Sequence, residues 1–176
     1  MKTLFIRREN MKVKGVRLYA ADDIRLEEFE LPEIQDDEIL VKVMSDSICM
    51  STWKMIKQGA KHKRVPADVA ENPIIIGHEF AGDIVKVGKK WQNQFKPGQK
   101  FAQQPAIPGQ AESPGYSYTQ CGGAATYCIS QMILLKQDVC GLMTETLILK
   151  LRLQNLCVVL LQDIKQITIR KTDMNM

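Results

Sequence analysis

The stretch from Pro73 to Gly88 constrains this chain more than any other part of its sequence. It reads Pro-Ile-Ile-Ile-Gly-His-Glu-Phe-Ala-Gly-Asp-Ile-Val-Lys-Val-Gly, an apolar run, a His-Glu pair and an alternating strand-like segment. Its glycines mark places where the backbone must turn tightly or approach another group closely. The neighbours His78 and Glu79 suit metal ligation, because imidazole nitrogen and carboxylate oxygen both bind first-row metals. A surface ion pair is the ordinary alternative for an isolated His-Glu pair.

A second segment with chemical potential lies about thirty residues earlier. It reads Ser-Ile-Cys-Met-Ser-Thr and follows the strongest strand pattern of the chain, residues 38–45. Cys49 of this segment, together with His78 and Glu79, forms a ligand set typical of a zinc site. Taken alone, Cys49 could equally be a small buried hydrophobic residue. The three residues together favour a metal site.

These motifs resemble a known family. A Cys-x-Ser/Thr element followed by Gly-His-Glu-Phe-x-Gly-x-Ile/Val-x-x-Val-Gly is similar to the zinc-dependent medium-chain dehydrogenases, the alcohol and sorbitol dehydrogenase superfamily. The segments Glu-Asn-Pro-Ile-Ile-Ile-Gly-His-Glu-Phe and Gln-Pro-Ala-Ile-Pro are most similar to the sorbitol dehydrogenase and sorbose-phosphate reductase-like branch. The resemblance extends from Met11 to Ile129. It implies a mainly β fold with short helices, a GroES-like, partly open β-barrel that is incomplete here.

The resemblance also implies roles at the site. Cys49 would give a thiolate to zinc, His78 an imidazole nitrogen, and Glu79 a carboxylate that ligates or exchanges with water. Ser51 matches the Ser/Thr that relays the proton of the substrate hydroxyl, so Ser51 and Glu79 are the catalytic candidates. Zinc would polarise the alcohol or carbonyl oxygen while hydride moves to or from a nicotinamide. The implied cofactors are Zn²⁺ and NAD(P), the implied substrate is a small alcohol, polyol or sugar phosphate, and the full-length family forms homo-oligomers.

The sequence departs from the family pattern in two places. Met50, Thr52 and Lys54 stand where the family usually has Gly, Asp and His, which alters the outer part of the proton relay. The segment 101–118 has none of the closely spaced cysteines of the family's structural zinc lobe, so we expect no second zinc.

The sequence divides into three parts. We expect an N-terminal extension over residues 1–10, a GroES-like catalytic domain over 11–130, and a tail without family motifs over 131–176. No Gly-x-Gly-x-x-Gly follows a strand pattern, so we expect no Rossmann domain in this chain. NAD(P) is thus a cofactor of the full-length family whose binding domain we expect to be absent here.

A shifted reading frame would explain why residues 131–176 lack family motifs. With permitted synonymous codons, shifting the frame by one base turns residues 130–156 into a segment that ends Leu-Ala-Glu-Pro-Met. That ending resembles the family segment whose Glu is the remaining zinc ligand of the sorbitol-type branch. We therefore expect 131–176 to be out of frame and the truncated chain to be inactive alone. The apolar run 147–161 would then aggregate, or pack as an amphipathic helix or an added strand.

Two other functions remain open at this point: an inactive metal-binding fragment, and a non-catalytic GroES-like interaction module. Binding of NAD(P)H separates an active dehydrogenase from an inactive fragment. An interaction module has no need of Cys49, His78 and Glu79 together.

The composition of the chain narrows the remaining classes of protein. At 176 residues the chain can form one domain with a core, and its net charge of +4 comes from scattered residues, so we expect no nucleic-acid partner. No apolar run is long enough to cross a membrane. Five cysteines without a repeating spacing indicate a reducing, cytoplasmic location rather than a disulfide framework, and we expect Cys121 and Cys128 to serve packing.

Periodicity predicts the secondary structure. We expect strands near residues 12–19, 24–31, 38–45, 84–87 and 125–129. A short helix over 51–58, capped by Ser or Thr, should end at Gly59. His62, in the basic loop that follows, is either a solvated loop residue or a group for substrate or metal.

Overall fold

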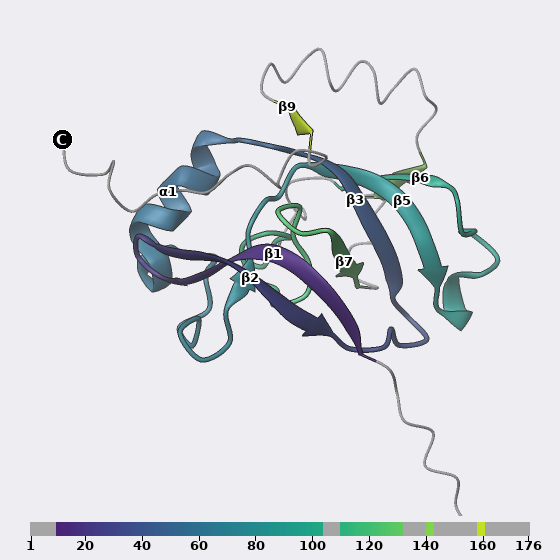
Figure 1. Cartoon of the computed structure of the whole chain (residues 1–176), viewed down its shortest axis with the longest axis horizontal. Helices are drawn as coiled ribbons and strands as arrows, with labels where there is room; N and C mark the ends of the chain where they lie inside the picture. The colour runs from purple at the N-terminus through teal and green to yellow at the C-terminus, as the bar shows by residue number, and fades with distance from the viewer. Residues whose placement is uncertain (1–9, 104–109, 132–139, 143–157, 161–176) are drawn as a thin grey trace, which may run out of the picture.

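A computed structural model describes residues 10–103, 110–131, 140–142 and 158–160, and the chain in this part is mostly β-strand (Figure 1). One α-helix, α1 (Met50–Gln58), and two short 3-10 helices, η1 (Gly59–Lys61) and η2 (Lys89–Trp91), accompany the strands. No helix among the described residues is long and apolar enough to cross a membrane.

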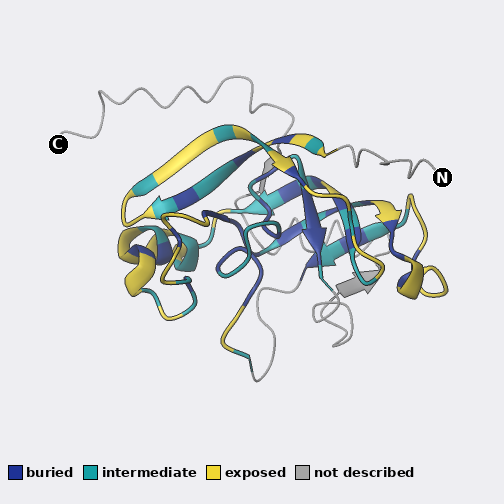
Figure 2. Ribbon diagram, turned by 90° about the horizontal axis from the view of Figure 1, so that it is seen from below, coloured by how far each residue is buried: buried dark blue, intermediate teal, exposed yellow. Residues whose placement is uncertain are grey.

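A three-stranded sheet has the order β2-β1-β4, with β1 at Met11–Ala20, β2 at Asp23–Leu31 and β4 at Ile74–Ile75. Strands β1 and β2 form an antiparallel hairpin whose turn holds Asp22 at a φ of 59°. Strand β2 is mostly solvent-exposed, and Figure 2 shows this outer strand largely in yellow. Strand β4 runs directly into Gly77 and His78, so this sheet fixes one side of the candidate site.

A six-stranded sheet has the order β7-β3-β5-β6-β8, and β9 pairs with the other half of β3. The bounds are β3 Ile39–Ser47, β5 Phe80–Val87, β6 Lys100–Gln103, β7 Tyr127–Ser130, β8 Cys140–Leu142 and β9 Val158–Leu160. Strands β3 and β5 are antiparallel neighbours, so the end of β3 lies beside the start of β5. That register brings the segment after Ser47 next to the segment before Phe80.

The two sheets are joined by backbone hydrogen bonds rather than by a continuous ladder. Thr126, just before β7, links them: its N–H donates to Lys14 O of β1 at 2.8 Å, and its carbonyl accepts from Val43 N–H of β3 at 3.1 Å. The sheets of the described residues do not close into a barrel. The expected partly open, incomplete GroES-like arrangement is therefore confirmed.

The core consists of three clusters of buried side chains. The largest fills the six-stranded sheet and contains Val41, Phe80, Phe101, Cys121 and Cys128, so the two cysteines serve packing as predicted. Trp91 is 6% exposed in this cluster, and its Nε1–H donates to Asp37 O at 3.0 Å. Trp53, on α1, is 51% exposed. The two tryptophans thus lie in opposite environments.

The predicted strands are present, and β5 begins at Phe80 rather than at residue 84. Strand β4 was hidden in the short apolar run before the His-Glu pair. Helix α1 ends at Gly59, which adopts a φ of 52° and donates its N–H to Met55 O, as predicted. The prediction of a Ser or Thr cap was wrong: the N-cap is Cys49, without a side-chain cap bond.

The predicted N-terminal extension lies almost entirely outside the described residues, as does most of the tail. Within the apolar run 147–161, residues 158–160 form β9 on β3, which is the added strand that we considered. The out-of-frame origin of 131–176 stays a prediction.

Candidate metal centre

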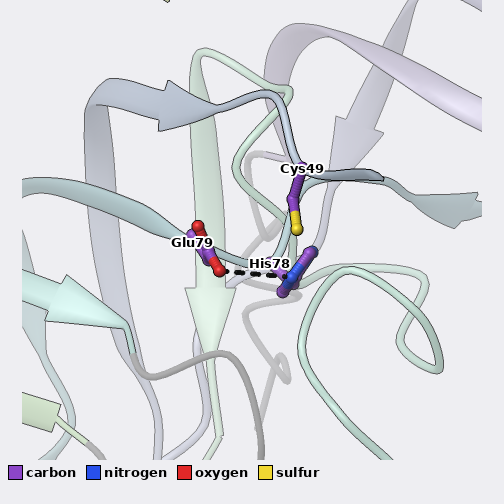
Figure 3. A group of neighbouring side chains, drawn as sticks. All are labelled: Cys49, His78 and Glu79. Atoms are coloured by element: carbon purple, nitrogen blue, oxygen red, sulfur yellow. Dashed lines mark ion pairs between the residues drawn. The ribbon is translucent and has the colours of Figure 1, made fainter. Parts of the chain in front are cut away.

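Two chain segments meet at the candidate site (Figure 3). Cys49 follows the end of β3 and caps α1, while His78 and Glu79 form the link between β4 and β5. Antiparallel pairing of β3 with β5 sets the segments side by side, and Ser47 N–H donates to Glu79 O at 3.1 Å. The sequence-predicted ligands, which are separated by about thirty residues, are therefore neighbours in space.

The potential ligand atoms of Cys49, His78 and Glu79 all lie within 4.8 Å of one another. His78 Nε2 is 3.6 Å from Glu79 Oε1, the contact drawn as a dashed line in Figure 3. Ligands at zinc-bonding distance on a tetrahedron stand roughly 3.4 Å apart, which agrees with this spacing. Among the described residues, this is the one group of His, Cys, Asp and Glu with such a geometry.

Hydroxyl groups surround the three side chains. Ser51 Oγ lies 2.9 Å from Cys49 Sγ and 3.2 Å from His78 Nε2, so it contacts two of the potential ligand atoms at once. Ser47 Oγ donates to Glu79 Oε2 at 2.5 Å. The predicted catalytic residues Ser51 and Glu79 therefore lie within the same hydrogen-bonded group as the predicted ligands.

Thr52 stands where the family usually has Asp, and its hydroxyl contacts His78. Its Oγ1 is 3.1 Å from His78 Nδ1. A hydrogen bond from Nδ1–H to this oxygen fixes the ring and leaves the lone pair of Nε2 for a metal, which is the usual role of the second partner of a ligating histidine. Sequence reasoning treated Thr52 only as a departure from the family pattern.

The environment of His78 favours its neutral form. The side chain is 5% exposed, and this burial, with the charge of Arg64 adding to it, lowers the pKa of the imidazole against the opposing effect of Glu79. A neutral imidazole is the form that ligates metals. The site can therefore offer its nitrogen near neutral pH.

One side of the site is bordered by what we call the aromatic stack: Tyr116, His62 and Arg64. The Tyr116 ring lies 4.8 Å from the His78 ring and 5.5 Å from the His62 ring, and the Arg64 guanidinium lies 5.5 Å from the Tyr116 centroid. The Tyr116 hydroxyl is 3.5 Å from His78 Nε2. His62 is therefore neither free in solvent nor part of the ligand group.

Another border of the site is what we call the rear wall: Asp46, Gly77 and Gly123. Gly77 has a φ of 90°, and a Cβ on either glycine would overlap the Asp46 carboxyl group. Asp46 Oδ1 is buried and has no hydrogen-bond partner among the described residues. Burial, with the charge of Glu79 adding to it, raises the pKa of Asp46 to about 8. Neither Asp46 nor Tyr116 carried a sequence signal that marked it for the site.

The donor set fits zinc. A thiolate, an imidazole and a carboxylate are the ligand types of catalytic zinc sites, which use three protein ligands and leave a position open. Hydroxyl partners on Nδ1 of His78 and on Oε2 of Glu79 supply the outer contacts that orient such ligands.

Comparison with known proteins agrees with the fold. The family described as alcohol dehydrogenase GroES-like domain matches residues 35–153, about two thirds of the chain. The chain belongs to this family. The match supports assignment to the oxidoreductases.

Two curated relatives are sugar-phosphate enzymes by name. The L-sorbose 1-phosphate reductase of Klebsiella pneumoniae is 52% identical over 126 residues, which are 70% of this chain and 31% of that protein. The mannitol-1-phosphate 5-dehydrogenase of Aliivibrio fischeri is 51% identical over 114 residues, 64% of this chain and 27% of that protein. The chain therefore spans less than a third of the length of these relatives.

A solved structure shares the fold. A protein from Sinorhizobium meliloti 1021 described as a zinc-binding dehydrogenase, crystallised with NADP, superposes with a TM-score of 0.57 at 23% identity. The superposition covers 77% of this chain and 40% of that one. At this identity the likeness establishes the fold.

Proposed function

We propose that this chain is the metal-holding part of a zinc-dependent, NAD(P)-linked oxidoreductase that acts on a polyol, a secondary alcohol or a sugar phosphate. The observation that carries the proposal is the convergence of Cys49, His78 and Glu79 within 4.8 Å. The names of the two sugar-phosphate relatives support the substrate class.

Cys49, His78 and Glu79 would hold the zinc, whose role is to polarise the substrate oxygen and stabilise negative charge on it. Ser51 is placed to take the proton of a substrate hydroxyl, because its Oγ contacts both Cys49 Sγ and His78 Nε2. Thr52 fixes the orientation of the imidazole from its other nitrogen. Ser47 holds one oxygen of Glu79, which leaves Oε1 to face His78.

Ser51 has a hydroxyl neighbour that the family's usual relay does not include. Ser51 is hydrogen-bonded to Tyr116, whose hydroxyl also reaches His78. We propose that Tyr116 orients the Ser51 hydroxyl, because Thr52 and Lys54 occupy the places where the family usually has Asp and His. Burial raises the pKa of Tyr116, with an opposing effect from its bond to Ser51, so the phenol keeps its proton near neutral pH.

Turnover would require a nucleotide-binding partner segment. The sequence has no Gly-x-Gly-x-x-Gly after a strand, so we propose that residues 11–130 form the catalytic domain, that 131–176 is an out-of-frame tail, and that the chain alone binds zinc without turning over substrate. An expected outcome is zinc binding without measurable NAD(P)H binding.

Zinc content tests the proposal. The purified chain, loaded with Zn²⁺ and desalted, should retain about one equivalent of metal, and Co²⁺ in its place should show the absorption of a thiolate-ligated tetrahedral site. Cys49→Ser and His78→Gln should each abolish both signals. His62→Gln is the matched control, since it changes the other histidine of the chain, which lies outside the ligand group. Retention of the cobalt thiolate signal in Cys49→Ser would overturn the assignment.

A further inference from the structure

We infer that Arg64 forms an anion subsite beside the metal centre and selects substrates that carry a phosphate group. The inference rests on the proposed function for the position of the reacting carbon. It adds a residue and a binding role that the family motifs do not contain.

The position of Arg64 is fixed by its own backbone. Its N–H donates to His62 Nδ1 at 3.3 Å, and its carbonyl accepts a hydrogen bond from Ser117 Oγ at 2.7 Å. Val65, the next residue, is 7% exposed and belongs to the same core cluster as Tyr116. The base of the side chain is therefore held, which lowers the entropy cost of binding a ligand there.

The guanidinium group lies over an aromatic ring. Its Cζ lies 5.5 Å from the Tyr116 ring centroid, a distance typical of cation–π contact. Within the described part of the chain, no carboxylate lies within ion-pair distance of Arg64. A contact with a ring uses none of the N–H hydrogen bonds of the group, and paired N–H donors match phosphate oxygens.

A cluster of lysines among the described residues does not offer this combination. A hollow at the far end of β3 and β5, lined by residues 33–37, 86–90 and 92, carries three lysines. These lysines pair with Glu33, Asp36 and Asp37 at 3.0 to 3.5 Å. The lysine charges of this hollow are therefore neutralised by carboxylates, whereas no carboxylate of the described residues neutralises Arg64.

Arg64 lies close to the candidate metal centre. One ring, that of Tyr116, separates the guanidinium from His78. The charge of Arg64 also acts on the site, where it adds to the effect of burial in lowering the pKa of both His78 and His62. A phosphorylated polyol with one hydroxyl carbon at the metal centre would bring its phosphate to Arg64.

The test compares two probes on the zinc-loaded full chain by titration calorimetry: D-sorbitol 6-phosphate and D-sorbitol. We expect the phosphorylated probe to bind at least about tenfold more tightly, as a charge-assisted pair predicts. Arg64→Gln should remove this preference, and Arg64→Lys, which keeps the charge without the planar fork, should restore part of it. Lys63→Gln is the matched control, because it removes the same charge from the neighbouring exposed residue and should preserve the preference.

Three results would overturn the inference: an unchanged preference in Arg64→Gln, an equal loss in Lys63→Gln, or no binding of the phosphorylated probe at millimolar concentration. Zinc content and the binding of unphosphorylated sorbitol, read on the same samples, separate this inference from the proposed function. Loss of zinc in the unmodified chain would sink the proposed function. If zinc is retained but the preference for the phosphorylated probe does not depend on Arg64, only the anion subsite is wrong.

Discussion

The rear wall and the aromatic stack border the same site and are built in opposite ways. The rear wall is tightly packed, since a Cβ on Gly77 or Gly123 would overlap the Asp46 carboxyl group. The aromatic stack consists of side chains in contact: His62 is stacked on Tyr116 at 5.5 Å, Arg64 lies over the same ring at 5.5 Å, and the Tyr116 ring is tilted against His78 at 4.8 Å. The comparison teaches that the candidate ligands are bordered by closely packed glycine backbone at one place and by side-chain contacts at the other.

The largest expected effect comes from Gly77→Ala, which attacks the rear wall. A φ of 90° strains any L side chain, and the new Cβ would also overlap Asp46 and crowd Ala124 N. We expect a loss of unfolding free energy above about 3 kcal/mol, together with loss of zinc. Urea unfolding and zinc content measure the two effects.

Gly98→Ala is the matched control for this substitution. Gly98 has a similar φ of 86°, but no heavy atom lies within 4 Å of the place of a Cβ. Its cost should be about 1 kcal/mol of backbone strain, with zinc retained. Equal losses in the two variants would show that the rear wall is not tightly packed.

A smaller effect is expected from Asp46→Asn, and it should depend on pH. The folded pKa of about 8 exceeds the ordinary 3.8, so the folded chain holds a proton that the unfolded chain has lost. The contribution of Asp46 to stability is therefore complete below about pH 4 and is lost as pH rises toward 8. Asparagine keeps the shape without the titration, so the variant should be more stable than the parent by about 2 kcal/mol at pH 8 and should show no such decline.

Thermal unfolding between pH 4 and pH 8 checks this expectation. Asp36→Asn, at an exposed residue near Lys89, should change stability by less than about 0.5 kcal/mol at every pH. Parallel stability curves for Asp46→Asn and the parent would contradict the buried, protonated state of this carboxyl group.

The smallest effect is expected from Tyr116→Phe, which touches the aromatic stack. The ring contacts with His62, His78 and Arg64 remain, and only the hydroxyl is removed. We expect a loss of less than about 1 kcal/mol in unfolding free energy and full zinc retention. A loss of zinc here would mean that the stack, like the rear wall, positions the ligands, and the contrast between the two sides would fail.

Sequence reasoning reached the ligands because their chemistry is local. The glycine before His78, the end of β3 before Cys49 and the alternation of β5 are all short-range patterns, and they placed the strands and the predicted ligand group. The helix cap was wrong because Cys49, not a hydroxyl residue, stands where the chain enters α1. The usual preference for Ser or Thr at a helix N-cap does not hold at Cys49, because this position is also a predicted metal ligand.

Other parts of the site depend on contacts between distant segments. Tyr116 lies in a loop rich in Gly and Ser, and nothing local shows that its ring meets His78, 38 residues earlier in the chain. Asp46 reads as an ordinary polar residue at a strand end, and its burial depends on the close approach of Gly77 and Gly123. Such residues are defined by tertiary packing, which periodicity does not contain.

The opposite placement of the two tryptophans gives the chain two optical probes. Trp53, 51% exposed, stands one residue after Thr52, and Trp91, 6% exposed, is embedded in the core of the six-stranded sheet. Indole emission follows the polarity of its surroundings, so binding at the site should shift the signal of Trp53 and leave that of Trp91 unchanged. Unfolding should shift the fluorescence emission of Trp91 to longer wavelength. A Trp91→Phe variant would then report on occupancy of the site by fluorescence alone, without an added label.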